Sequence, residues 1–112
     1  MSTNPSLIAI NHVAADRADE FEQWLRANVL PAVREHRPDQ MDRWQMLRAP
    51  EQDDTVVYVF LFHGGGPAEW ELLPLLEQTH GPETAQRLMG ELSGLLTEDQ
   101  YGWELAPVDL AG

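Results

Sequence analysis

The sequence predicts an α+β fold in which a small antiparallel sheet carries its helices on one face, in the order βαββαβ. Two observations lead to this prediction. Stretches 6–13 and 55–63 have the composition of strands, and each is followed by an amphipathic helical stretch. The chain has only 112 residues, enough for one core but too few for an all-parallel, doubly wound sheet. We therefore expect residues 1–112 to form a single domain.

The first half of the chain is expected to form a strand, a helix and a second strand. Residues 7–10 are a short apolar run, typical of a strand that is buried on both faces. Asp16 or Asp19 can cap the following helix. Its apolar stripe comprises Phe21, Trp24, Leu25, Val29, Ala32 and Val33. Pro31 interrupts this stripe, so we expect a kink or a helix end there. Residues 42–48 then alternate as a half-exposed strand does.

The second half is expected to repeat the pattern. Residues 56–62 are the clearest strand of the sequence, and Pro67 suits the first turn of a helix. Pro74 is expected to break that helix internally. After Pro82 the helical period is regular, with apolar side chains at Ala85, Leu88, Met89, Leu92, Leu95 and Leu96. Residues 101–108 supply a last strand.

The strand over residues 56–62 is apolar on both of its faces. One face carries Val56, Tyr58, Phe60 and Phe62, and the other carries Val57, Val59, Leu61 and His63. Burial of each large apolar side chain is worth roughly 1.5 to 3 kcal/mol. In this ferredoxin-like order both helices cover the same face. A second copy of the sheet is the simplest cover for the other face, so we expect a homodimer.

The composition argues against several classes of partner. The chain has 19 acidic and 7 basic residues, for a net charge of -12, which repels nucleic acids and anionic lipid surfaces. Cysteine is absent, which excludes disulfides and thiolate chemistry. No stretch approaches the roughly 18 apolar residues of a membrane span, and the N-terminus has no signal-peptide pattern. We expect a cytoplasmic protein that binds neither nucleic acid nor membrane.

A local motif adds a family resemblance. Phe21, Trp24, Leu30 and Pro31 resemble the F-x-x-W/Y...H-x-P pattern on the first helix of EthD-like proteins, although the histidine of that pattern falls at Val29. Together with the element order, the motif makes the chain similar to the dimeric α/β barrel superfamily. This group includes the antibiotic-biosynthesis monooxygenases and the muconolactone isomerases. The resemblance implies a small homodimeric enzyme that acts on small molecules.

A second resemblance is to the haem-degrading branch of the same superfamily. Members of this branch use an Asn late in the first strand, and a Trp and a His ten residues apart on the second helical segment. Asn11, Trp70 and His80 have that order and spacing. On one continuous helix the Trp and His side chains would point roughly 80° apart and could flank a wide, flat ligand. Haem binding or degradation is therefore a lesser alternative.

Four polar residues are candidates for catalysis: Asn11, His12, His63 and His80. His12 and His63 end strands that are neighbours in the ferredoxin-like order, and histidine suits proton transfer. The alternative for both is a hydrogen bond to a nearby loop. His80 lies at the end of a helix, where a capping role is the alternative. No pair of histidines has the spacing of a metal site, so we expect neither a metal nor another cofactor.

Aromatic side chains are the candidates for a substrate-binding wall: Trp24, Tyr58, Phe60, Trp70 and Trp103. They can build an apolar pocket with few polar groups, as small-molecule sites do. The same side chains could instead form the core or a dimer interface. The leading hypothesis is a cofactor-independent monooxygenase, cyclase or isomerase that acts on an aromatic or polycyclic metabolite in this pocket. The alternative is a non-catalytic homodimer that binds a small hydrophobic ligand or has a structural role.

Overall fold

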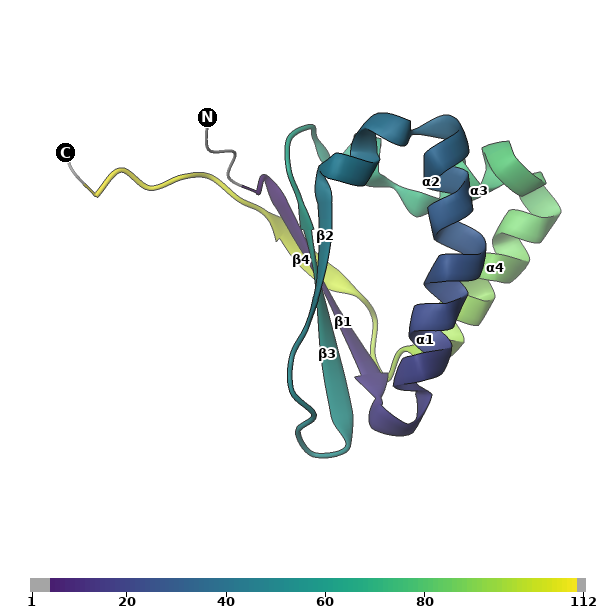
Figure 1. Ribbon diagram of the computed structural model, residues 1–112, viewed down its shortest axis with the longest axis horizontal. Helices are drawn as coiled ribbons and strands as arrows, with labels where there is room; N and C mark the ends of the chain where they lie inside the picture. Colours follow the sequence, from purple (N-terminus) through teal and green to yellow (C-terminus); the bar gives the residue numbers. More distant parts are fainter. Residues whose placement is uncertain (1–4, 111–112) are drawn as a thin grey trace.

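The computed structural model describes residues 5–110, which form one antiparallel sheet covered by helices on a single face (Figure 1). The strand order is β2-β3-β1-β4. The strands are β1 (Leu7–Ala14), β2 (Trp44–Arg48), β3 (Thr55–Phe62) and β4 (Tyr101–Glu104). The α-helices are α1 (Ala18–Trp24), α2 (Leu30–His36), α3 (Leu72–His80) and α4 (Pro82–Leu95). This arrangement confirms the predicted α+β, ferredoxin-like fold.

The first helical segment is continuous in space but changes its winding before Pro31. The π-helical segment η2 (Leu25–Val29) joins α1 to α2, and Pro31 lies in the first turn of α2. Proline has no amide hydrogen to donate, and the first turn of a helix does not need one. The interruption expected at Pro31 is therefore a change from π to α winding. The segment begins with η1 (Ala15–Arg17) and leads through η3 (Pro38–Asp42) into β2.

The expected break of the second helix at Pro74 is wrong. Pro74 is the third residue of α3, so its missing amide also falls in a first turn. The break lies earlier, at Glu71, whose extended backbone separates α3 from the short 3-10 helix η4 (Pro67–Trp70). Trp70 therefore does not share a helix with His80, and it is not part of the apolar stripe of α3.

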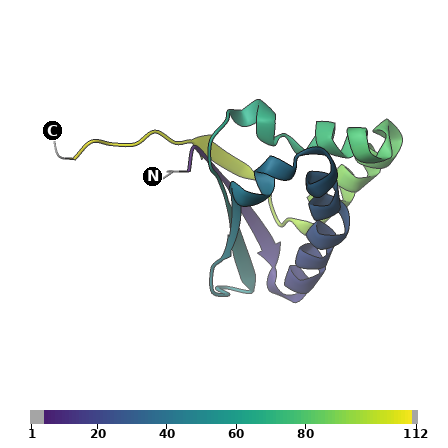
Figure 2. The same ribbon diagram turned by 45° about the horizontal axis from the view of Figure 1, so that its top comes forward.

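The last strand is shorter than expected. It ends at Glu104, although the Leu105 amide still donates to the carbonyl oxygen of Ser6 at 2.8 Å. Residues 106–110 continue away from the domain (Figures 1 and 2). Between α3 and α4 the chain turns at Gly81, which has a φ of 86°. A left-handed backbone of this kind favours glycine, and Pro82 then starts α4.

The helices bury one face of the sheet, and no other element within residues 5–110 covers the opposite face. On the helical side Val56 and Tyr58 are fully buried, and Phe21 of α1 packs its ring 4.8 Å from that of Tyr58. On the outer side Val57, Val59 and Leu61 are only half-buried. The outer side also carries three large, exposed side chains, which are Leu47 (50%), Tyr101 (42%) and Trp103 (58%). The two-sided apolar strand expected from the sequence is therefore present, with one side unshielded within the subunit.

No helix within residues 5–110 is long and apolar enough to cross a membrane.

The contact between α1 and the sheet should dominate the stability of the subunit. Phe21→Ala removes a ring with no solvent exposure, and such truncations cost about 3 to 5 kcal/mol. Urea unfolding should show a loss of this size. Gln86→Ala, on the exposed side of α4, is the control and should change the free energy of unfolding by less than about 0.5 kcal/mol. A loss below 1 kcal/mol for Phe21→Ala would contradict this packing.

Candidate functional site

A cavity of about 810 Å³ lies between the helices and the sheet. Most of its wall is apolar. The sheet contributes Leu7, Ala9, Phe60 and Phe62, and the helical segments contribute Leu25, Val29, Val33, Leu72, Leu75, Met89 and Leu92. Cavities of 300 to 1,000 Å³ with such walls are typical of sites for small organic molecules.

One side of the cavity is closed by η4 and the turn before it. Arg37 donates to the carbonyl oxygens of Glu69 (2.9 Å) and Glu71 (3.0 Å), and Gln40 donates to Glu69 at 2.7 Å. The Trp70 indole donates to the carbonyl oxygen of Gly64 at 2.9 Å, and its ring lies 4.7 Å from that of Phe62. These bonds hold Trp70 in the wall of the cavity.

The cavity also reaches the edge of the sheet at β4. Tyr101 and Trp103 line it, although the register pairs them with Ile10 and Ile8 on the outer face of the sheet. Gly102, between them, has no room for a side chain because a Cβ atom would collide with the backbone of β1. This close approach of β4 to β1 fixes where the side chains on either side of Gly102 lie.

Two residues of this edge connect the cavity to the predicted catalytic residues of β1. Gln100 lines the cavity and donates to Oδ1 of Asn11 at 2.7 Å. Asn11 is fully buried, and its amide nitrogen is 3.4 Å from the carbonyl oxygen of Tyr58. The Tyr101 hydroxyl lies 3.0 Å from Nε2 of His12. Asn11, on the helical face of β1, therefore contacts a residue of the cavity wall, whereas His12 lies on the outer face of the sheet, opposite Val57.

His63 and His80 lie elsewhere. The antiparallel register places His12 opposite Val57, six residues from His63, so the two histidines are roughly 20 Å apart along the sheet. They therefore do not meet in one pocket, because neighbouring antiparallel strands finish at opposite ends of the sheet. His63 Nε2 is 3.1 Å from Oε1 of Gln45. His80 is exposed at the end of α3.

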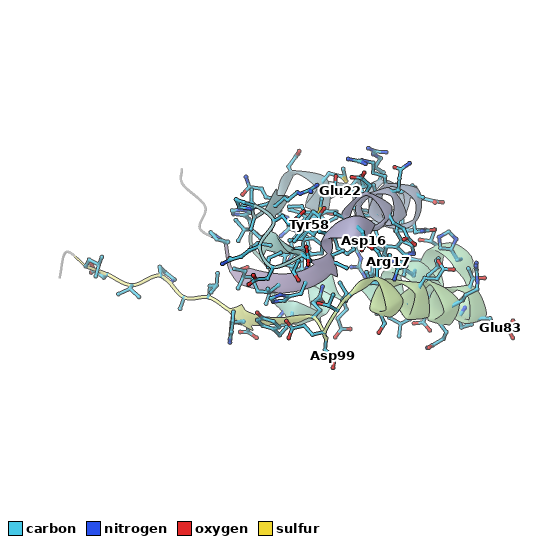
Figure 3. All side chains as sticks on the ribbon, turned by 90° about the horizontal axis from the view of Figure 1, so that it is seen from below. Asp16, Arg17, Glu22, Tyr58, Glu83 and Asp99 are labelled. Atoms are coloured by element: carbon cyan, nitrogen blue, oxygen red, sulfur yellow. The ribbon has the colours of Figure 1, made fainter. Side chains whose placement is uncertain are left out.

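Three of the five expected wall residues, Phe60, Trp70 and Trp103, do line the cavity. The other two lie outside its lining, and their polar atoms bond to acidic side chains of α1 and α4. The Trp24 indole donates to Glu91 at 3.1 Å. The Tyr58 hydroxyl donates to Oε2 of Glu22 at 2.5 Å, and Figure 3 shows the two residues close together.

The Tyr58 and Glu22 pair has altered acidity. Burial, followed by the bond to the Glu22 carboxylate, raises the pKa of Tyr58 to about 12. The same bond from Tyr58, aided by Arg48 at 2.8 Å, lowers the pKa of Glu22 below its ordinary value. The pair ties α1 to β3, and Arg48 extends the link to β2. Its role is structural, since neither residue lines the cavity.

Sequence reasoning missed the polar residues of the cavity wall, among them Arg37, Gln40 and Gln100. None carries a motif, and Gln100 meets Asn11 across 89 residues of sequence. Tyr101 was assigned only to the last strand. Within residues 5–110, no group of three or more His, Cys, Asp or Glu side chains is placed to hold a metal ion.

Comparisons with known proteins agree on the fold. No protein-family model matches the chain, and no curated protein matches its sequence. Among solved structures, a protein of Caulobacter crescentus that is provisionally named an antibiotic biosynthesis monooxygenase superposes with a TM-score of 0.50 at 14% identity. That match covers 96% of this chain and 94% of the other. The chain is also similar to Rv0793 of Mycobacterium tuberculosis, with a TM-score of 0.48, 20% identity and 96% and 97% coverage.

The superposition on the Caulobacter crescentus protein shows a shared fold. The chain therefore has the fold of the antibiotic-biosynthesis-monooxygenase-like proteins, as the sequence resemblance predicted. At such identities the comparison concerns the fold alone.

The Glu22 contacts predict a specific pH dependence of stability. Because the pKa of Glu22 is lowered by folding, its contribution is fully present above its unfolded pKa of about 4.3 and is lost as the pH falls through the folded pKa. Glu22→Gln should therefore be less stable than the parent protein at pH 7, and the difference should shrink toward pH 3. Urea unfolding of both proteins across this range checks it. A difference that does not vary with pH would contradict the assignment.

Proposed function

We propose that this protein is a cofactor-independent enzyme of the monooxygenase, cyclase or isomerase type that acts on an aromatic or polycyclic metabolite. The observation that carries the proposal is the cavity of about 810 Å³ with its apolar wall. Phe60, Trp70 and Trp103 supply aromatic surfaces at three places around it. An apolar site that orients its substrate can supply much of a reaction's rate without a cofactor.

The few polar groups of the wall set the chemistry of the ligand. Gln100 and Arg37 line the cavity and carry side-chain hydrogen-bond donors. This supports a ligand that is aromatic and carries one or a few oxygen atoms.

The outer face of the sheet supports a homodimer. Leu47, Val59, Ile8, Tyr101 and Trp103 form one apolar surface there, because the register pairs them across four strands. Contiguous exposed apolar surface is typical of protein interaction sites. A second sheet packed on it would bury this surface and cover the cavity where it reaches β4. The dimer is thus part of the proposed site.

A second candidate is a non-catalytic dimer that binds a small hydrophobic ligand. The observation in its favour is that none of the predicted catalytic residues, Asn11, His12, His63 and His80, is in the lining of the cavity. The haem alternative assumed that Trp70 and His80 lie on one helix and flank a flat ligand. They lie on different helices, η4 and α3, so this argument for haem binding does not hold.

Filling the cavity should weaken ligand binding. Met89→Trp adds a large side chain to the wall, and we expect at least tenfold weaker binding of 1-nitronaphthalene by titration calorimetry. Gln86→Trp, on the exposed side of the same helix, is the matched control and should bind as the parent does. Equal affinity in all three proteins would contradict this location.

Turnover then separates the two candidate functions. Incubation with aromatic phenols and quinones in air, followed by mass spectrometry, should reveal oxygenated or isomeric products with the parent protein and Gln86→Trp. Met89→Trp should form none. Binding without any product would reject the enzyme and leave the ligand-binding protein.

A charge on the outer face should separate the proposed dimer. Leu47→Glu places a carboxylate on a side chain that is 50% exposed in the subunit, so the subunit itself should still fold. Light scattering should give a mass near 12.7 kDa for this variant. Met46→Glu is the control, because Met46 is the neighbouring residue on the opposite face of β2 and should leave the dimer intact. Equal masses for the two variants would contradict the interface.

A further inference from the structure

Arg37 continues the face of the first helical segment that lines the cavity. Val29, Val33 and Arg37 follow one another at steps of four residues along α2, and all three line the cavity. Residues four apart lie one above the other on the same side of a helix. The Arg37 side chain therefore leaves the end of α2 on the side of the cavity, after two apolar residues of the same stripe.

Contacts with η4 fix the position of the Arg37 guanidinium group. Its Nη1 donates to the carbonyl oxygens of Glu69 and Glu71, on either side of Trp70. Trp70 and Glu71 both line the cavity. Gln40, another lining residue, donates to the same Glu69 carbonyl oxygen. The guanidinium group therefore lies in the cavity wall, between the end of α2 and η4.

The guanidinium group of Arg37 has donors left for a ligand. Both of its hydrogen bonds use Nη1, whereas Nε and Nη2 donate to no group within residues 5–110. Neither of these two nitrogens is among the buried atoms that lack a partner, so both are accessible. Nε and Nη2 of an arginine present parallel N–H groups, and this planar fork matches the two oxygens of a carboxylate.

The positive charge of Arg37 also lacks an acidic partner. The chain has seven basic residues, all of them arginines. Ion pairs with Asp or Glu side chains are formed by Arg17, Arg26, Arg43, Arg48 and Arg87. The other two, Arg34 and Arg37, form none with any described residue, and Arg34 is exposed and lies outside the cavity lining. A half-buried arginine in an apolar wall favours an anionic partner, and here a ligand can supply it.

We infer that Arg37 binds the carboxylate group of the ligand, so that the cavity takes an aromatic carboxylic acid in its ionised form. This inference rests on the proposed function, because it names the substrate class of the same cavity. The ligand carboxylate accepts hydrogen bonds from Nε and Nη2 of Arg37. Its aromatic part lies along the apolar wall, which Val33 and Val29 extend from the arginine.

The charges of the wall favour a ligand with a single negative charge. One guanidinium group balances one carboxylate, and no second cation is among the described residues that line the cavity. Glu71 and Glu104 also line it, but both are exposed, so water and salt screen their charges. A dianion such as a phosphate ester would keep one uncompensated charge beside these carboxylates. A neutral ligand would leave the Arg37 charge without a partner.

Two ligands of the same shape test the assignment. The probes are 1-naphthoic acid, which is ionised at pH 7, and 1-naphthamide, its neutral counterpart. By titration calorimetry, the parent protein should bind the acid more tightly than the amide by about tenfold or more. Arg37→Gln should bring the two affinities to within about twofold of each other. Arg37→Lys keeps a cation but loses the planar fork, so the preference should fall by about threefold or more.

Arg34→Gln is the matched control. It removes the same charge from an exposed position of the same helix, and it should keep the full preference for the acid. The preference is a ratio of two affinities measured in one protein. A general loosening of η4 in an Arg37 variant would therefore weaken both ligands and leave the ratio unchanged.

Binding of 1-nitronaphthalene, measured in parallel, reports on the cavity itself. A preference for the acid that is present in the parent and in Arg34→Gln, and is reduced in both Arg37 variants, would support the assignment. If the parent binds 1-nitronaphthalene and 1-naphthamide without preferring the acid, or if the preference survives unchanged in either Arg37 variant, the assignment is overturned and the proposed cavity stands. If the parent binds none of the three ligands, the proposed function itself is overturned.

Discussion

The structure depends on a four-stranded sheet that is apolar on both faces while its own helices can cover only one. The covered face holds Tyr58, Phe60 and the ring of Phe21, and the cavity lies between this face and the helices. The other face leaves Trp103 58% exposed. Burial of apolar surface is worth about 25 cal/mol for each Å². Packing of a second protein surface against this face is therefore favoured. The proposed homodimer and the proposed site are two consequences of this one constraint.

Strand β4 lies where the uncovered face of the sheet meets the proposed substrate pocket. As an edge strand it pairs only with β1, and its residues reach both the cavity and the outer face. The residues next to and within it, Gln100 and Tyr101, bond to Asn11 and His12 of β1. The proposed substrate pocket and the proposed interface therefore meet at one strand pair. A change in the contact between the proposed subunits would therefore alter the position of β4 at the proposed site.

The sequence predicted the elements well because their signals are local. The alternation over residues 56–62 and the regular apolar period after Pro82 identify a strand and a helix without reference to the rest of the chain. Pro74 was misjudged, since a proline inside a helix and one in its first turn look alike in sequence. The cavity wall was only half predicted: large aromatic residues suggest a pocket, whereas the bond of Gln100 to Asn11 depends on pairing across 89 residues. The separation of His12 from His63 follows from an antiparallel register, which no single residue encodes.

The mass of the unmodified protein in solution tests the central constraint most directly. Sedimentation equilibrium over a wide range of concentrations should fit a species of twice the 12.7 kDa chain mass, with dissociation only on dilution. A single species at 12.7 kDa at every concentration would contradict the account, because the outer face of the sheet would then be stable in water without a partner subunit.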